Sequence, residues 1–149
     1  MNRENKTLVL ALLRSQQTFL RTIGPVLRSA GLTASQWDAL ETLSNKGELS
    51  VNDLMRFTLS TSGNLDVVVK NLMQLGFVEK IIDQNDRRAR VLRLTPAGRL
   101  KVESFLPTHD QALEDIFGQL TLADKQDTIR VLNRLRKKLI PTKDHKHDQ

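Results

Sequence analysis

The chain of 149 residues is long enough for one globular domain with a core, and its 39% hydrophobic and 27% charged residues are ordinary for a soluble protein. Its formal net charge of +6 favours a polyanionic partner, while aromatic residues, at 4%, are too scarce for the stacking surfaces that bind single-stranded nucleic acid. Because the sequence contains no cysteine, structural disulfides, thiolate metal sites and thiol-based redox sensing are excluded within this chain.

The first predicted element is a long helix from Asn5 to Ala30. Its apolar seam has near-heptad spacing and consists of Leu8, Leu12, Phe19, Ile23, Val26 and Leu27. Gly24-Pro25 lies inside this helix and predicts a kink or a short break, because proline removes a backbone donor and clashes with the preceding turn. The apolar run at residues 7–13 is too short to span a bilayer and lacks cleavage-site residues, so we expect a cytoplasmic protein that does not enter the membrane.

Two shorter helices are predicted next. Thr33 and Gln36 have the spacing of a capping box, which opens a helix that runs through Asn45. A second helix is expected over Val51–Phe57. Between them, Glu48-Leu49 is predicted to form a brief edge strand.

The stretch from Ser60 to Gly98 predicts one helix, a β-hairpin and the start of another helix. The first of these helices has an apolar stripe formed by Leu65, Val68, Val69, Leu72 and Leu75, and Gly76 ends it. Two β-prone runs, Phe77–Ile82 and Arg90–Leu94, flank a polar turn. With the short helix upstream, this order predicts a mainly α fold: a winged helix-turn-helix with a small three-stranded antiparallel wing sheet.

Two helical regions complete the chain. Thr95-Pro96 predicts an N-cap followed by proline at the first helical position. Pro107 lies within the pattern that follows, which leaves either one kinked helix or two helices. Thr121 and Asp124 cap the last helix, and residues 141–149 are predicted to be a disordered tail. We expect residues 1–149 to form a single domain.

Five blocks of this sequence, in the expected order, resemble the MarR family of bacterial transcriptional regulators. The resemblance covers roughly Leu8 to Leu139. The blocks are Gly31-Leu32-Thr33, Gln36-Trp37, Leu72 through Gly76-Phe77-Val78, Asp86-x-Arg88 and Leu92-Arg93-Leu94-Thr95-Pro96-Ala97-Gly98.

The resemblance implies a homodimeric regulator that binds a pseudo-palindromic site on double-stranded DNA. Residues 33–94 would form the DNA-binding lobe, and residues 5–30 and 96–140 the dimerisation helices. The implied function is that of a repressor released by a small aromatic or phenolic ligand, without a cofactor. The alternative is a non-sensing architectural or protein-interaction winged helix. An enzyme is not expected, because no catalytic constellation can be assembled from the sequence.

The wing and recognition helix supply the expected DNA contacts. Arg88 is expected to reach the minor groove, with Asp86 orienting a neighbouring arginine. The alternative for these residues is a solvated hairpin turn. The full predicted DNA-binding set is Ser50, Asn52, Thr61, Ser62, Gly63, Asn64, Val67, Lys70, Asn71, Arg87, Arg88 and Arg90.

The recognition helix departs from the family pattern at three positions. Many members present an arginine where Val67 stands and an Asp-Arg pair where Lys70-Asn71 stands. An outward-facing valine in the major groove could instead pack on thymine methyl groups, and Gly63 on the same face would allow close backbone approach. The alternative is an exposed valine without a partner.

A ligand pocket is expected only from the resemblance. Phe19, Ile23, Trp37 and Leu40 are its candidate lining residues, and the alternative for the tryptophan is plain core. The three histidines, His109, His145 and His147, are interpreted as surface residues, since a metal site needs more ligands in a defined geometry.

Overall fold

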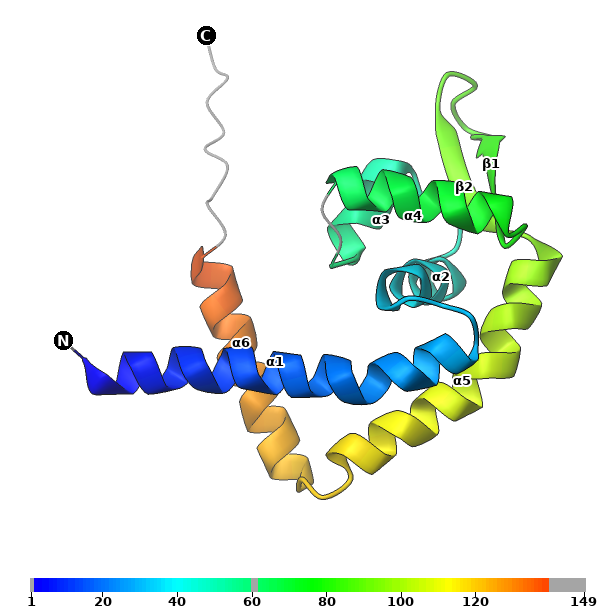
Figure 1. The fold of residues 1–149 in the computed structure, drawn as a ribbon. Helices are drawn as coiled ribbons and strands as arrows, with labels where there is room; N and C mark the ends of the chain where they lie inside the picture. The colour runs from blue at the N-terminus through cyan, green and yellow to red at the C-terminus, as the bar shows by residue number, and fades with distance from the viewer. Residues whose placement is uncertain (1, 60–61, 140–149) are drawn as a thin grey trace, which may run out of the picture. The chain divides into compact units, whose positions relative to one another are not determined.

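The computed structural model describes residues 2–59 and 62–139, which form six helices and two strands (Figure 1). In chain order these elements are α1 (Arg3–Ser29), α2 (Ala34–Lys46), α3 (Val51–Phe57), α4 (Ser62–Gln74), β1 (Val78–Ile82), β2 (Arg90–Leu94), α5 (Pro96–Phe117) and α6 (Leu122–Leu139). The chain divides into two compact units, Met1–Leu113 and Glu114–Gln149. The mainly helical, winged helix-turn-helix fold class predicted from the sequence is confirmed.

Helix α1 spans nearly the predicted range and starts two residues earlier, at Arg3. It is continuous through Gly24 and Pro25, so of the predicted kink or short break the break is absent. Proline removes only one backbone donor, and helical turns on both sides continue the pattern. The helix ends at Ser29. Gly31, two residues later, has a φ of 72° in the left-handed region, and the N–H of Leu32 donates to the carbonyl of Leu27 at 3.1 Å.

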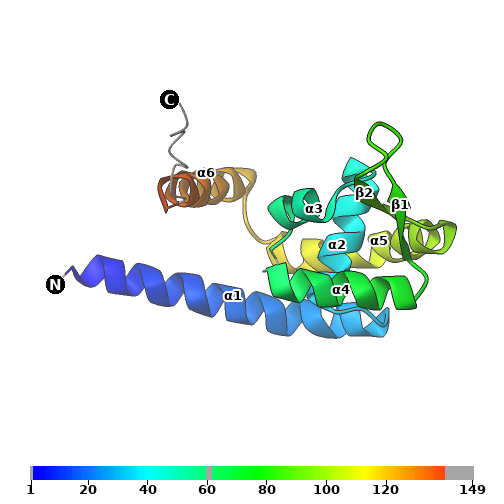
Figure 2. The ribbon, with the colours of Figure 1, turned by 90° about the horizontal axis from the view of Figure 1, so that it is seen from above.

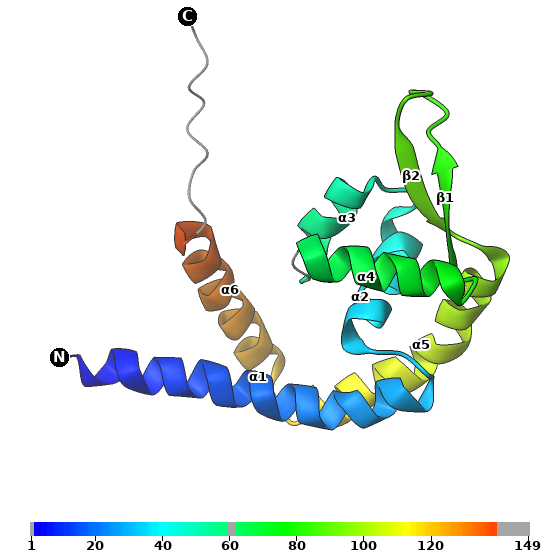
Figure 3. The same cartoon turned by 45° about the horizontal axis from the view of Figure 1, so that its top comes forward.

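Helices α2, α3 and α4 form the helix-turn-helix, with α4 passing across α2 (Figure 3). The predicted capping box at the start of α2 is present: Gln36 N–H donates to Thr33 Oγ1, and Thr33 N–H donates to Gln36 Oε1. Leucines of the three helices meet in a core that includes the fully buried side chains of Leu40, Leu54, Leu65 and Leu72. The turn between α3 and α4 is tied to α2, because Asp38 accepts a hydrogen bond from Leu59 N–H at 2.9 Å.

Strands β1 and β2 form the wing, a hairpin that extends away from the helix-turn-helix (Figure 2). They pair antiparallel, in a register that runs from Val78 opposite Leu94 to Ile82 opposite Arg90. The predicted third strand is wrong in detail. Leu49 pairs with Leu92 through two hydrogen bonds, but within the described residues this is an isolated bridge. The short segment between α2 and α3 leaves room for only that one extended pairing.

Helix α5 begins against the end of α4. Thr95 Oγ1 accepts from Gly98 N–H at 3.0 Å, which confirms the predicted N-cap, and the Thr95 hydroxyl donates to the carbonyl of Gly76. A Cβ atom on Gly98 would lie 2.0 Å from the carbonyl oxygen of Phe77, so this position has no space for a side chain. Pro107 does not divide the segment, and α5 is one continuous helix over Pro96–Phe117.

The second unit contains the capped helix α6. Asp124 N–H donates to Thr121 Oγ1, and the Asp124 carboxylate accepts from the Thr121 hydroxyl and N–H, which lowers the pKa of Asp124. The predicted disordered tail, with His145 and His147, lies outside the described residues. Over residues 2–59 and 62–139, no helix combines the length and the apolar character needed to cross a membrane.

Candidate nucleic-acid interface

The solvent face of α4 carries the predicted recognition residues. Leu65 and Leu72 are fully buried, and this orientation turns Val67, Lys70 and Asn71 outward. Val67 is 57% exposed and presents an aliphatic side chain to solvent. Gly63 is also exposed, and a Cβ added there would meet nothing within 4 Å. The face is therefore open to close approach by another molecule.

The start of α4 differs from the prediction in one contact. Asn64 Nδ2 donates to Ser35 Oγ at 3.4 Å, so this side chain links α4 to the start of α2 instead of pointing only toward a base or phosphate. Ser62 is the first residue of α4. Thr61 lies outside the described residues.

The start of α3 presents a capped helix end beside α4. The Ser50 hydroxyl accepts from Asp53 N–H at 3.1 Å and donates to the Asp53 carboxylate at 3.0 Å. This is ordinary N-capping. Of the two DNA contacts predicted on this segment, Ser50 and Asn52, only the Asn52 side chain is exposed.

The tip of the wing is closed by two carboxylates. Asp83 accepts from Asn85 N–H at 2.9 Å, and Asp86 accepts from Arg88 N–H at 3.0 Å. Asp86 therefore positions Arg88 through its backbone, and the expected bond to an arginine side chain is replaced by this Asx turn. The turn holds the adjacent Arg87 and Arg88 side chains exposed at the end of the hairpin.

The three wing arginines are not equivalent. Arg90 folds back, with Nη1 within 3.3 Å of the Ala89 carbonyl and 3.5 Å of the Arg87 carbonyl. In the part of the chain that the structure describes, Arg87 and Arg88 form no ion pair. Their charges remain available to an external anion, which suits them for phosphate or minor-groove contact.

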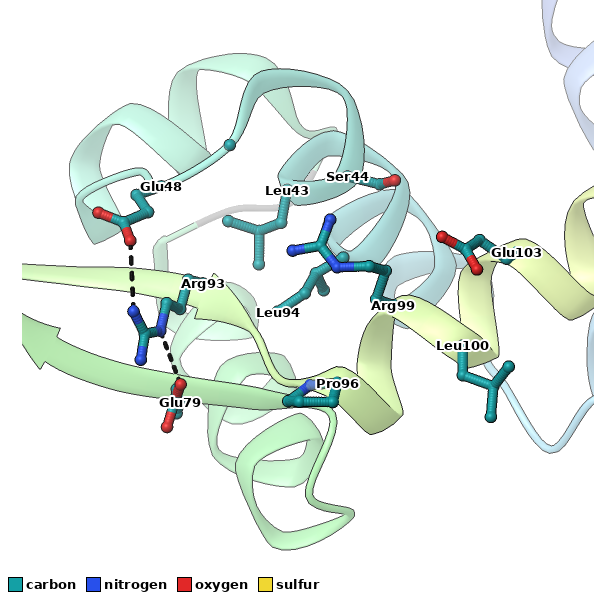
Figure 4. A pocket seen from close by; sticks show the side chains of 11 residues that line it. Leu43, Ser44, Glu48, Glu79, Arg93, Leu94, Pro96, Arg99, Leu100 and Glu103 are labelled. Carbon is teal, nitrogen blue, oxygen red and sulfur yellow. Dashed lines mark hydrogen bonds and ion pairs between the residues drawn. The ribbon is translucent and has the colours of Figure 1, made fainter.

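The base of the wing contains a cationic residue that the sequence did not single out. Arg93 Nε donates to Glu79 at 2.7 Å, and Arg93 Nη1 lies 3.6 Å from Glu48 (Figure 4). The hydrogen bond and charge of Glu79, followed by Glu48, raise the pKa of Arg93. Arg93 thereby connects both strands to the segment between α2 and α3. The signal that could have found it is the cross-strand pairing of Glu79 with Arg93.

The residues predicted to line a ligand pocket lie mainly in the core. Ile23, Trp37 and Leu40 are buried, and Phe19 is partly buried. Trp37 packs edge-on against Phe105, with 4.9 Å between ring centroids.

His109 was expected at the surface, and this is wrong. It is 7% exposed, and its ring centroid lies 4.9 Å from that of Trp37, because α5 turns this residue toward α2. Trp37 Nε1 and His109 Nδ1 are both buried and have no hydrogen-bond partner among the described residues. Nearby, burial raises the pKa of Glu41 and His109 partly offsets that effect. The described residues contain no cluster of three or more histidine, aspartate or glutamate side chains that could hold a metal ion.

The comparisons with known proteins agree with this geometry. A sequence model described as the MarR family matches residues 30–89, which contain the helix-turn-helix and most of the wing. The multiple antibiotic resistance protein MarR of Salmonella typhimurium is 26% identical over 121 residues, covering 81% of this chain and 82% of that protein. The chain is therefore similar to the MarR family over the helix-turn-helix and the first part of the wing.

Two solved structures have a fold similar to that of this chain. Bordetella bronchiseptica BpsR, whose DNA binding is regulated by 6-hydroxynicotinic acid, is 26% identical with a TM-score of 0.77, over 85% of this chain and 90% of that one. Sco3205 from Streptomyces coelicolor, a MarR-family regulator solved in complex with DNA, is 19% identical with a TM-score of 0.86, over 95% and 91% of the two chains. The protein is a DNA-binding transcriptional regulator, and its relatives are not enzymes, as predicted.

Proposed function

We propose that this regulator is a homodimeric repressor that binds a pseudo-palindromic DNA site and is released by a small aromatic or phenolic ligand. The observation that supports this most directly is the open face of α4 beside the two unpaired wing arginines. A helix face that includes Val67 and Lys70 fits the major groove, while Arg87 and Arg88 fit the flanking backbone or minor groove.

Dimerisation is supported by apolar side chains that the isolated chain leaves exposed on α1 and α6. On α1 they are Leu8, Val9, Leu10, Leu13 and Leu20, and on α6 they are Leu122, Ile129, Val131, Leu132, Leu135 and Leu139. Helix α6 has no buried residue in the described chain. Apolar surface of this extent is typical of an interface with another chain. Two-fold symmetry would place the half-sites about one DNA turn, roughly 10 bp, apart.

Ligand release is supported by the buried contact of Trp37 with Phe105 and His109. Two nitrogens there make no hydrogen bond among the described residues: Trp37 Nε1, and His109 Nδ1, which lies 3.8 Å from Asp110 Oδ1. An oxygen of a phenol or an aromatic acid could supply that hydrogen bond. The similar protein BpsR responds to a hydroxylated aromatic acid, 6-hydroxynicotinic acid. Because Trp37 is only 4% exposed, such a ligand would have to separate α2 from α5 to enter.

The test begins by selecting bound genomic fragments and footprinting the purified protein on them. The proposal expects protection of an inverted repeat that overlaps a promoter, and reduced transcription in vitro from that promoter. Addition of 6-hydroxynicotinic acid or 4-hydroxyphenylacetic acid should restore transcription. Protection without sequence preference would favour the architectural alternative, while increased transcription on binding would show an activator.

A further inference from the structure

A cleft of about 500 Å³ lies behind the wing, on the face of the sheet that carries Glu79 and Arg93 (Figure 4). Its walls come from the end of α2, the segment that follows it, both wing strands and the first turns of α5. Sites for small molecules have volumes in this range. The predicted DNA contacts and the residues around Trp37 do not line it, so the cleft is separate from the proposed inducer site.

The charges in the cleft divide into a paired and an unpaired set. Arg93 is bound to Glu79 and Glu48. Arg99 and Glu103, one turn apart on α5, are exposed, and neither forms an ion pair with any residue that the structure describes. Arginine four residues before glutamate is the less favourable order for a pair within one helix, which gives a reason why they do not bind each other.

The unpaired groups and an apolar surface meet in the same cleft. Ser44, Arg99 and Glu103 all line the cleft, and Figure 4 shows the Arg99 guanidinium extending toward Leu43. Leu94 lines the cleft from the sheet, and Leu100, on its rim, is 66% exposed. The cleft thus combines one available cation, one available anion, a hydroxyl and apolar side chains.

We propose that this cleft binds a small zwitterion with an apolar side chain, of the chemical class of an α-amino acid. Arg99 would hold the carboxylate through a two-pronged hydrogen bond, assisted by Ser44, and Glu103 would hold the ammonium group. A ligand with only a carboxylate would be repelled by the unpaired carboxylate of Glu103. A ligand with only an ammonium group would be repelled by the guanidinium of Arg99. A phosphate would meet three carboxylates, those of Glu48, Glu79 and Glu103.

The experiment is an NMR titration of the full-length, isotopically labelled protein with alanine, valine, leucine and phenylalanine. At least one of the four should give saturable shifts in amides around Ser44 and from Arg99 to Glu103. Two analogues of leucine separate the charges: 4-methylpentanoate lacks the ammonium group and isoamylamine lacks the carboxylate. Each should bind about tenfold or more weakly than leucine, the loss expected for one charge-assisted hydrogen bond.

Variants locate the binding. Arg99→Gln and Glu103→Gln alter exposed side chains and should each weaken the amino acid by about tenfold or more, with an unchanged melting temperature. Lys80→Gln is the matched control, because it removes a positive charge from the opposite face of β1 and should leave binding unchanged. The proposal is overturned if none of the four amino acids gives saturable shifts at the cleft, if 4-methylpentanoate binds as tightly as leucine, or if both cleft variants bind as the wild type does.

Discussion

Arg88 and Val67 are both exposed on the surface assigned to DNA, but they offer different chemistry. Arg88 is held at the wing tip by the bond from its N–H to Asp86, and its charge has no partner in the described chain. Val67 projects from the solvent face of α4 and carries no charge. A guanidinium that binds a phosphate releases counterions, whatever the base sequence. A methyl group releases none and can discriminate only the bases that it contacts. Replacement of each residue by alanine should therefore change DNA binding in a different way.

Replacement of Arg88 by alanine should weaken binding to every duplex. It should also reduce the slope of log K against log salt concentration by roughly one unit for each phosphate that the guanidinium had neutralised. The measurement is fluorescence anisotropy on operator and scrambled duplexes over a range of salt. Arg130→Ala, which removes a charge already paired with Asp127 on α6, is the control and should change neither quantity. Unchanged affinity of the Arg88 variant would remove the wing tip from the interface.

Replacement of Val67 by alanine should leave the salt slope unchanged, because no counterion is released by an apolar contact. The expected cost is about 1 kcal/mol, concentrated at A·T positions of the operator, where thymine methyl groups line the major groove. The affinities of the wild type and of the Val67 variant for a set of operators with single base changes identify the base pair that Val67 contacts. An equal loss on operator and scrambled duplex would show that Val67 reads no base.

At the scale of elements, Gly98 determines how closely α5 approaches the end of α4. The N–H of Thr95 donates to the carbonyl of Phe77, and the Thr95 hydroxyl donates to that of Gly76, so the first turn of α5 packs directly on the backbone of the preceding turn. Only a residue without a Cβ fits there. This packing also holds together the two junctions of the wing, from α4 into β1 and from β2 into α5.

Replacement of Gly98 by alanine should lower the free energy of unfolding by about 1–3 kcal/mol, because the new methyl group overlaps the Phe77 carbonyl and the turn must shift. Urea denaturation followed by circular dichroism gives this quantity. Gly63→Ala is the matched control: it lies at the start of α4 with open space around it, and should not lower the free energy of unfolding. Equal stability of the two variants would contradict the close packing at Gly98.

At the scale of the whole molecule, the isolated chain leaves the apolar sides of α1 and α6 in water. A helix without a single buried residue in the described chain, such as α6, has little packing to stabilise it by itself. A second copy of the chain would supply the missing contacts.

Leu132→Glu should therefore weaken or abolish the dimer, since it places a charge on the apolar side of α6. Sedimentation equilibrium at micromolar concentration should give a dimer for the wild type and a species near 16.9 kDa for the variant. Asn133→Glu adds the same charge at the neighbouring exposed position and should remain dimeric. A monomeric wild-type protein would contradict the dimer, and operator binding should then show no requirement for two half-sites.

The local elements of this protein could be predicted because their signals lie within a few residues. The capping box of Thr33 and Gln36, the left-handed glycines that follow α1 and α4, and the Thr95-Pro96 start of α5 are each satisfied by nearby backbone groups. The strand pair with its polar turn is likewise a short-range pattern. Together with the wing motif, these signals were enough to predict the winged helix-turn-helix.

What only the tertiary structure decided depends on contacts between residues far apart in the chain. His109 is buried because α5 packs it on Trp37, and Asn64 is partly engaged because α4 starts beside Ser35. Leu49 makes one bridge where a strand was expected. Arg93 joins two glutamates from different segments. Local propensity cannot predict these contacts. Their free energy comes from burial and from charge–charge interactions, which arise only when the elements pack together.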